Sequence, residues 1–244
     1  MKHNIILRNL PKEKIQIDIW PFEIQGGFRG FQQVPNGLHY IAVLFHNTYP
    51  GFWCFIEGAT VVKAFNLEKS QFIDADNKTT IASQALADSG AMNKDLIVFP
   101  KASELQWYRL TSHISPKNYD QIVNLTPSSI STNINDKEVI AAYQMAFLKV
   151  IVCQPELLEP YKMQLWKEWI QAFYQANVTT IQNRITLFPI IIDLLILHQE
   201  LMPKAYDSEL VFIKKEAKNF IYKLEIIGDS LLSQKAKQYQ FFIH

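Results

Sequence analysis

His39 is the residue of this sequence whose type and surroundings most readily suggest chemistry. It lies in the apolar segment 38–46, where an imidazole could act as a general base or as a metal ligand. A histidine ring can equally be a buried structural group whose nitrogen atoms form hydrogen bonds with a turn or with a neighbouring carbonyl group. We therefore predict a structural role for His39 and keep catalysis or metal binding as the alternative.

Two further polar residues, Asp193 and His198, lie in or just after the apolar run 187–197. Their separation of five residues places them roughly 140° apart around a helix, so they do not share a face. A carboxylate among leucines must find a hydrogen-bond donor. We expect Asp193 to be bonded to a neighbouring helix end or to an arginine such as Arg184.

The two cysteines, Cys54 and Cys153, lie far apart and form no cluster with histidine. This spacing indicates neither a zinc site nor a disulfide framework, so both are expected to be small buried residues. The sequence also has no phosphate-binding loop and no hydrolase or metalloprotease motif. We predict no cofactor, no metal site and no catalytic residue. The alternative is an enzyme or small-molecule-binding protein with a pocket between a β half and a helical half, containing His39, Asp193 or Cys54.

Charges are balanced and spread along the chain, with 24 basic residues, 23 acidic residues and a net charge of +1. We therefore expect no direct binding to nucleic acid. The apolar run 187–197 is too short to span a bilayer and contains Pro189, so we expect no membrane contact. Residues 1–14 carry charges and no apolar signal-peptide core, which predicts a reducing, cytoplasmic location.

The elements that must position these residues begin with β-strands. The segment from Phe28 to Tyr40 is typical of a hairpin, because Pro35, Asn36 and Gly37 favour a turn. Alternation over 15–20 predicts another half-buried strand. The remaining expectations are a strand pair over 52–57 and 60–65, a short helix or ordered loop over 79–91, and an extended segment over 96–100.

A helix docked on the β half is predicted next, from residues that recur on one helical face: Trp107, Leu110, Thr111 and Ile114. Ser115 followed by Pro116 then favours the start of another helix, because serine caps free N–H groups and proline is tolerated at the first helical position.

Beyond the polar segment 126–135 the hydrophobic period becomes helical. Five helices with short links are expected: one capped by Asp136, then 155–173 with Trp166 and Trp169 in the core, 178–201 kinked or restarted at Pro189, 208–227 and 229–242. A hydrophobic content of 48% over 244 residues supports a substantial core. We predict an α+β protein with a β-rich, sandwich-like N-terminal domain (1–125), a linker (126–135) and an all-α C-terminal domain (136–244).

Three aromatic residues form an apolar cluster at the end of the last expected helix, 229–242: Tyr239, Phe241 and Phe242. Such a cluster either folds back onto the helices or is offered to a partner. Both outcomes stay open, and the three residues are the candidate interaction residues.

Segments in both halves resemble the AAR-two splicing-factor family. The first has an aromatic residue, glycine, proline, glycine and histidine in the family's order, the second is a Trp-x-x-Leu-Thr-x-x-Ile-Ser run, and the third lies in the helical half. The matching residues, expected to be mostly structural, are Phe28, Gly30, Pro35, Gly37, His39, Trp107, Leu110, Ile114, Phe147 and Trp166. The resemblance implies that the helical half is similar to the VHS fold.

The resemblance also implies a function without catalysis. Members of that family are assembly chaperones for a small nuclear ribonucleoprotein. They bind the spliceosomal scaffold protein Prp-eight at its RNase H-like and Jab/MPN-like domains and hold off a helicase until maturation. This sequence departs from the pattern, because its link between the halves is short and it has no basic nuclear-import cluster. The alternative is a compact homologue with an unassigned partner in a cell without spliceosomes.

Overall fold

The computed structural model describes residues 3–12, 14–24, 26–153 and 158–243. The chain folds into two compact units, residues 1–115 and residues 116–244. Within the described residues, every β-strand belongs to the first unit and the second unit is helical, so the predicted α+β class is confirmed. None of the described helices combines the length and the apolar character that a membrane span requires.

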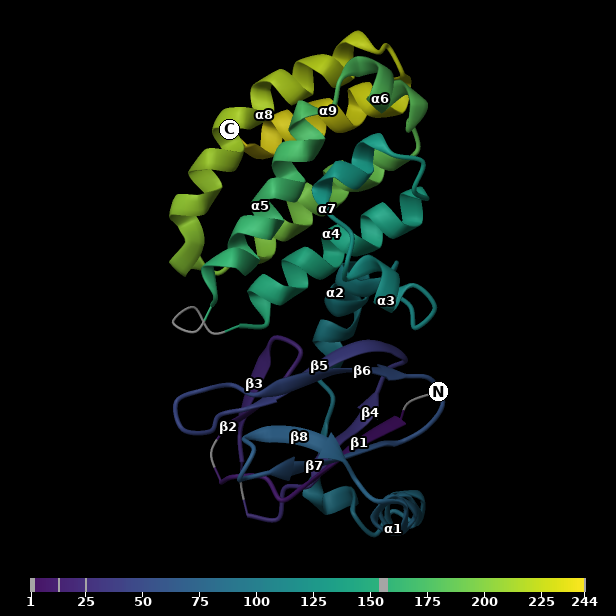
Figure 1. The fold of residues 1–244 in the computed structure, drawn as a ribbon, viewed down its shortest axis with the longest axis vertical. Helices are drawn as coiled ribbons and strands as arrows, with labels where there is room; N and C mark the ends of the chain where they lie inside the picture. The colour runs from purple at the N-terminus through teal and green to yellow at the C-terminus, as the bar shows by residue number, and fades with distance from the viewer. Residues whose placement is uncertain (1–2, 13, 25, 154–157, 244) are drawn as a thin grey trace. The chain divides into compact units, whose positions relative to one another are not determined.

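The first unit is a sandwich of two β-sheets (Figure 1). Its strands are β1 (His3–Arg8), β2 (Lys14–Ile17), β3 (Trp20–Glu23), β4 (Gly30–Val34), β5 (Gly37–Val43), β6 (Gly51–Ile56), β7 (Val61–Asn66), β8 (Gln71–Asp74) and β9 (Leu96–Val98). One sheet is mixed and has the order β8-β7-β1-β4-β9, and the other is antiparallel with the order β3-β2-β5-β6.

The core of the first unit lies between these sheets. Ile5 and Phe31 come from the mixed sheet, Ile17 and Ile41 come from the antiparallel sheet, and all four side chains are fully buried in one cluster. The opposite face of the mixed sheet is covered by helix α1 (Asn77–Asp88), which begins where Asp76 accepts a hydrogen bond from the backbone of Thr79. A helix was one of the two predicted possibilities for this region.

The predicted hairpin at Pro35 is wrong, because β4 and β5 belong to different sheets. The turn carries the chain from one layer to the other, so that Phe31 before it and Ile41 after it enter the same core. Two residues with positive φ redirect the backbone around the turn, Gln33 at 60° and Gly37 at 128°. A tight turn with two apolar flanks therefore makes a corner between layers here.

The predicted pairing of 52–57 with 60–65 is wrong for the same reason, because β6 and β7 lie in different sheets. The true partner of β6 is β5, which it meets in antiparallel register. The predicted strand 15–20 is also divided, into β2 and β3, since Asp18 has a φ of 56° and reverses the chain.

Helix α2 (Lys101–Thr111) packs against β5, as the helical spacing predicts. Trp107, Leu110 and Thr111 are its buried residues, and Ile114 just beyond it is also buried. The indole Nε1 of Trp107 donates a hydrogen bond to the carbonyl oxygen of Leu38 at 2.7 Å. This bond satisfies a buried polar group and fixes the helix to the sheet.

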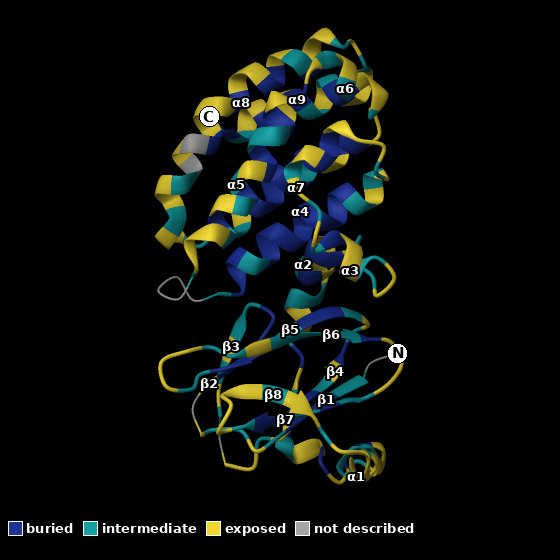
Figure 2. Cartoon of the chain, in the orientation of Figure 1, coloured by how far each residue is buried: buried dark blue, intermediate teal, exposed yellow. Residues whose placement is uncertain are grey.

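The second unit is a helical assembly whose elements are α3 (Tyr119–Ile122), η2 (Pro127–Ser131), α4 (Asp136–Ile151), α5 (Pro160–Gln175), α6 (Val178–Asn183), α7 (Leu187–Leu201), η4 (Lys204–Tyr206), α8 (Asp207–Ile226) and α9 (Ser230–Ile243). Helices α4 and α7 contact each other at its centre, α5 packs on α4, and α9 packs on α7 and α8. Figure 2 shows α4 and α7 largely in the colour of buried residues, as expected for helices that are apolar nearly all round.

Several predicted boundaries differ from those in the structure. The segment 126–135, predicted as a linker, contains η2, whose Ile130 is buried and which contacts α5 in the second unit. Asn135 is the N-cap of α4 in place of Asp136. Helix α3 begins at Tyr119, so Ser115 is not its cap. The expected helix start at Pro155 lies outside the described residues, and α5 begins at Pro160.

The third predicted helix breaks before Pro189. The interruption lies between α6 and α7, and Pro189 occupies the first turn of α7. A proline in the first turn costs no backbone hydrogen bond, because the first N–H groups of a helix have no intrahelical partner.

Candidate functional site

The two motif segments of the N-terminal half, distant in sequence, meet within the first unit. The ring of Trp107 in α2 stacks beside that of His39 in β5, with centroids 6.5 Å apart and planes inclined by 20°. Phe99 meets the same imidazole edge-on at 5.6 Å. The strand-to-helix contact is therefore built around His39.

His39 is buried and both of its ring nitrogens face oxygen atoms. Nδ1 lies 2.9 Å from Oδ2 of Asp18, and Nε2 lies 2.9 Å from the carbonyl oxygen of Pro35. The other carboxylate oxygen of Asp18 accepts a hydrogen bond from the backbone N–H of Tyr40 at 2.9 Å. Because two oxygen acceptors require two N–H donors, this geometry favours an imidazolium paired with a carboxylate.

The electrostatic environment favours the same state of His39. Burial lowers its pKa, but the charge of Asp18 and the hydrogen bonds to Asp18 and Pro35 outweigh that effect, and the pKa is raised above 6.5. Burial raises the pKa of the Asp18 carboxyl, and the contact with His39 opposes this rise. The pair ties the β2–β3 turn to the 35–37 turn.

Cys54 lies directly across from His39 in the register of β5 and β6. Burial, together with the charge of Asp18, raises the pKa of its thiol to about 12, although Lys63 opposes the shift. Nε2 of His39 is bonded to Pro35, so the ring has no nitrogen left for the thiol. A cysteine, a histidine and an aspartate are thus near neighbours without forming an activated nucleophile.

A groove of about 690 Å³ lies outside this buried pair, between the turn at Pro35 to Gly37 and helix α2. Two large side chains of α2 stand at the groove with most of their surface exposed, Leu105 at 70% and Tyr108 at 63%. The polar groups of His39 and Trp107 are engaged in internal hydrogen bonds. The groove therefore offers apolar surface more than chemistry.

The candidate polar residues of the second unit, Asp193 and Arg184, also form internal hydrogen bonds. Asp193 is partly exposed, and its Oδ1 accepts a hydrogen bond from Nζ of Lys235, so the expected arginine is not its partner. Arg184 instead donates to the carbonyl oxygens of Thr132 and Ile134. In the part of the chain that the structure describes, no group of three His, Cys, Asp or Glu side chains could hold a metal ion.

His198 is fully buried in the second unit. Its ring stacks on Phe147, with centroids 3.8 Å apart, and its Nδ1 accepts a hydrogen bond from the indole of Trp166 at 3.4 Å. Burial lowers the pKa of His198 well below 6.5. The ring is therefore a neutral core residue, and Phe147 and Trp166 are its supports.

The two buried histidines predict opposite pH responses. His39 has a raised pKa, so its stabilisation is present below pH 6.5 and is lost as the pH rises through the folded-state value. His198 has a lowered pKa, so its contribution is present above pH 6.5 and is lost as the pH falls. Between about pH 5 and 8, acidification should strengthen the first unit and weaken the second.

Hydrogen exchange of the full chain, corrected for intrinsic rates, measures this response separately in β5 and α7. In the variant His39→Gln, the pH dependence of β5 should flatten while that of α7 is kept. Protection of β5 that increases with pH in the parent protein would contradict the prediction.

The three terminal aromatic residues differ in their exposure. Tyr239 is fully buried and its hydroxyl is hydrogen-bonded to that of Tyr174 and to the amide of Gln199. Phe241 is 88% exposed, and Phe242 lies between these extremes. Of the three, Phe241 is available to a partner.

Gly30 shows why the first motif contains glycine at that position. Its φ is 139°, and an added Cβ would meet the carbonyl group of Ile5 in β1. Phe28 packs edge-on against Phe31 at 5.4 Å and adds to the sandwich core. Both residues support the sheet and do not face the groove.

The sequence alone does not identify Asp18 as the partner of His39. Within the alternating segment 15–20, an aspartate looks like an ordinary solvent-facing residue of a strand. The signal for a turn is that aspartate tolerates positive φ and follows directly on the alternating residues of β2.

The comparisons with known proteins agree with the motif segments. The model of one protein family, the AAR2 N-terminal domain, matches residues 1–124. A search of curated proteins gave no match. The matched region spans the whole sandwich and α2, more than half of the chain, and contains both motif segments that meet at His39. The chain therefore belongs to the AAR2 family.

Proposed function

We propose that this protein is a non-enzymatic assembly factor that binds a large protein partner. The observation that carries the proposal is the contrast at the groove: the polar side chains of the motif are engaged internally, while Leu105 and Tyr108 are largely exposed. Exposed apolar side chains beside a preformed groove are typical of a protein interface. Family membership supports the same class of function.

By resemblance to the family, the partner is the scaffold protein Prp-eight, or a related scaffold where the host has no spliceosome. The mechanism is occupancy of a surface on that partner during assembly, without turnover. Direct contact with nucleic acid is not part of the proposal, since the net charge is +1. Both cysteines are free thiols, which is compatible with the cytoplasmic location that we also propose.

The groove is tested by the double variant Leu105→Asp, Tyr108→Asp. Its affinity for the RNase H-like and Jab/MPN-like domains of the host's Prp-eight should fall at least about thirtyfold, because truncation of interface hot spots costs about 2 kcal/mol or more. Isothermal titration calorimetry measures the loss. Both side chains are exposed, so thermal unfolding should be nearly unchanged.

The matched control is Ile81→Asp on α1, an equally exposed apolar residue away from the groove. This variant should bind as the parent protein does. Equal affinity of the parent and the groove variant would remove the groove from the interface. Absence of binding by the parent protein would overturn the choice of partner.

A further inference from the structure

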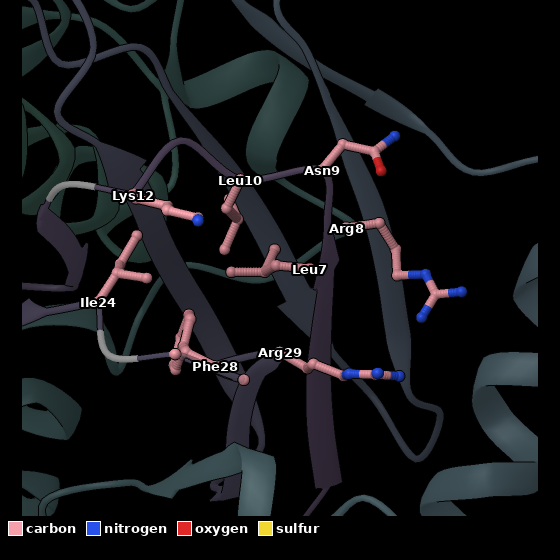
Figure 3. A pocket seen from close by; sticks show the side chains of 10 residues that line it. Leu7, Arg8, Asn9, Leu10, Lys12, Ile24, Phe28 and Arg29 are labelled. Atoms are coloured by element: carbon pink, nitrogen blue, oxygen red, sulfur yellow. The ribbon is translucent and has the colours of Figure 1, made fainter.

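A second pocket in the first unit, of about 610 Å³, lies where β1 ends and the chain approaches β4 (Figure 3). Its lining includes the cationic side chains of Arg8, Lys12 and Arg29 and no acidic side chain. The pocket does not share any residue with the groove beside α2.

The apolar side chains of the pocket lie together. Figure 3 shows Leu7, Leu10, Ile24 and Phe28 on one side of β1. Leu7 is buried in the sandwich core, whereas Leu10, Ile24 and Phe28 pack against that core and are only partly buried. This arrangement leaves an apolar floor with room for one aliphatic or aromatic side chain.

The cationic side chains stand on both sides of this floor. Arg8 and Arg29 point to the other side of β1, and Lys12 lies beside Leu10 and Ile24 (Figure 3). Nε of Arg29 is 3.6 Å from Oδ2 of Asp95. Among the described residues, Arg8 and Lys12 have no ion-pair partner. Asp95 therefore compensates Arg29, and no carboxylate in the described part of the chain compensates the other two cations of the pocket.

Cations on both sides of an apolar floor indicate which class of ligand the pocket can bind. A nucleic-acid backbone would need a longer run of cations and would leave the floor empty. A guanidinium group binds a carboxylate through two parallel hydrogen bonds, and no carboxylate of the described residues pairs with Arg8. Gly26 adds no obstruction, because nothing lies within 4 Å of the position that a Cβ would occupy.

We propose that this pocket binds an acidic peptide segment of a protein partner, with one apolar side chain on the floor formed by Leu10, Ile24 and Phe28. Carboxylates that flank this side chain pair with Arg8 on one side and with Lys12 on the other. The inference rests on the proposed function, because its ligand is part of a protein partner, but it uses a surface separate from the α2 groove.

Selection from a phage-displayed library of random dodecapeptides on the full chain tests this proposal. The enriched peptides should contain acidic residues on both sides of a leucine, isoleucine or phenylalanine. A synthetic copy of the best peptide, followed by fluorescence anisotropy, should bind more weakly as salt is added. Amide chemical shifts of the protein should change at Leu10 and Phe28.

The decisive variant is Arg8→Glu, Lys12→Glu, because neither side chain forms an ion pair with any residue that the structure describes. The affinity for the selected peptide should fall at least about tenfold. The control Lys69→Glu, Lys78→Glu changes the net charge equally at exposed sites away from the pocket and should bind as the parent protein does. Thermal unfolding of both variants verifies that they are folded.

Selection of peptides without this acidic and apolar pattern, no enrichment at all, or equal binding to the parent and to Arg8→Glu, Lys12→Glu would each overturn the inference. Its failure is distinguishable from that of the proposed function. Retention of Prp-eight domains together with loss of peptide selection removes only this pocket. Peptide binding here without any binding to Prp-eight removes the proposed partner and leaves the peptide site.

Discussion

Replacing Asp18 with alanine is expected to lower the free energy of unfolding of the first unit by about 3–5 kcal/mol, the cost of removing one member of a buried ion pair. The substitution leaves the imidazolium of His39 and the backbone N–H of Tyr40 without their acceptor. It also places alanine at a φ of 56°, a left-handed conformation that alanine tolerates less well than aspartate does. Hydrogen exchange of β5 in the full chain measures the loss.

The substitution Asp18→Asn separates the charge from the hydrogen bonds. The amide oxygen can still accept from Tyr40, and the amide nitrogen can donate to Nδ1 of a neutral His39, whose Nε2–H remains bonded to Pro35. We expect a smaller destabilisation and a pKa of His39 that is no longer raised, which a nuclear magnetic resonance titration measures.

The control for both variants is Asp74→Ala, which removes a carboxylate from the ion pair with Lys63. That side chain is 86% exposed, so its loss should cost no more than about 1 kcal/mol. Similar losses for Asp18→Ala and Asp74→Ala would contradict the role assigned to burial.

Replacing Trp166 with alanine is expected to destabilise the second unit by about 3–5 kcal/mol, because it opens a large cavity in a closely packed core. Trp166 is fully buried, and its ring lies 5.6 Å from that of Phe147. The substitution also removes the hydrogen bond to Nδ1 of His198. Hydrogen exchange of α4 and α7 in the full chain measures the effect.

Two further variants divide this loss into its parts. Trp166→Phe keeps an aromatic ring and loses the N–H group, so it should cost less than the alanine variant. Tyr161→Ala lies on the same helix but is 60% exposed, and it should leave exchange in α4 and α7 nearly unchanged. An equal effect of Trp166→Ala and Tyr161→Ala would show that Trp166 does not support the core.

The sequence predicted the helical half well, because a helix buries residues at a period that is visible within one segment. The residues of α2 and the apolar run of α7 are examples. Strand pairing is decided by residues distant in the chain, and Pro35 and Gly37 favour a turn without determining whether it lies within one sheet or between two. The predicted hairpin failed for that reason.

The prediction of the site was limited in the same way. His39 was singled out from its type, but its partner Asp18 comes from another strand that reaches it only after folding. The pocket that contains Arg8, Lys12 and Arg29 is assembled from two separate segments, and neither segment alone has a concentration of charge. The sequence alone therefore indicates an ordinary surface with balanced charges.

The position of β1 within its sheet has a consequence for biosynthesis. This strand precedes all the other described strands, yet it lies in the middle of the mixed sheet, between β7 and β4. A ribosome releases it long before its parallel neighbour β7, and β9 follows later still. Until β4 and β7 have both been synthesised, Ile5, Ile6 and Leu7 therefore lack the strands that pair with β1 and are exposed as substrates for general chaperones.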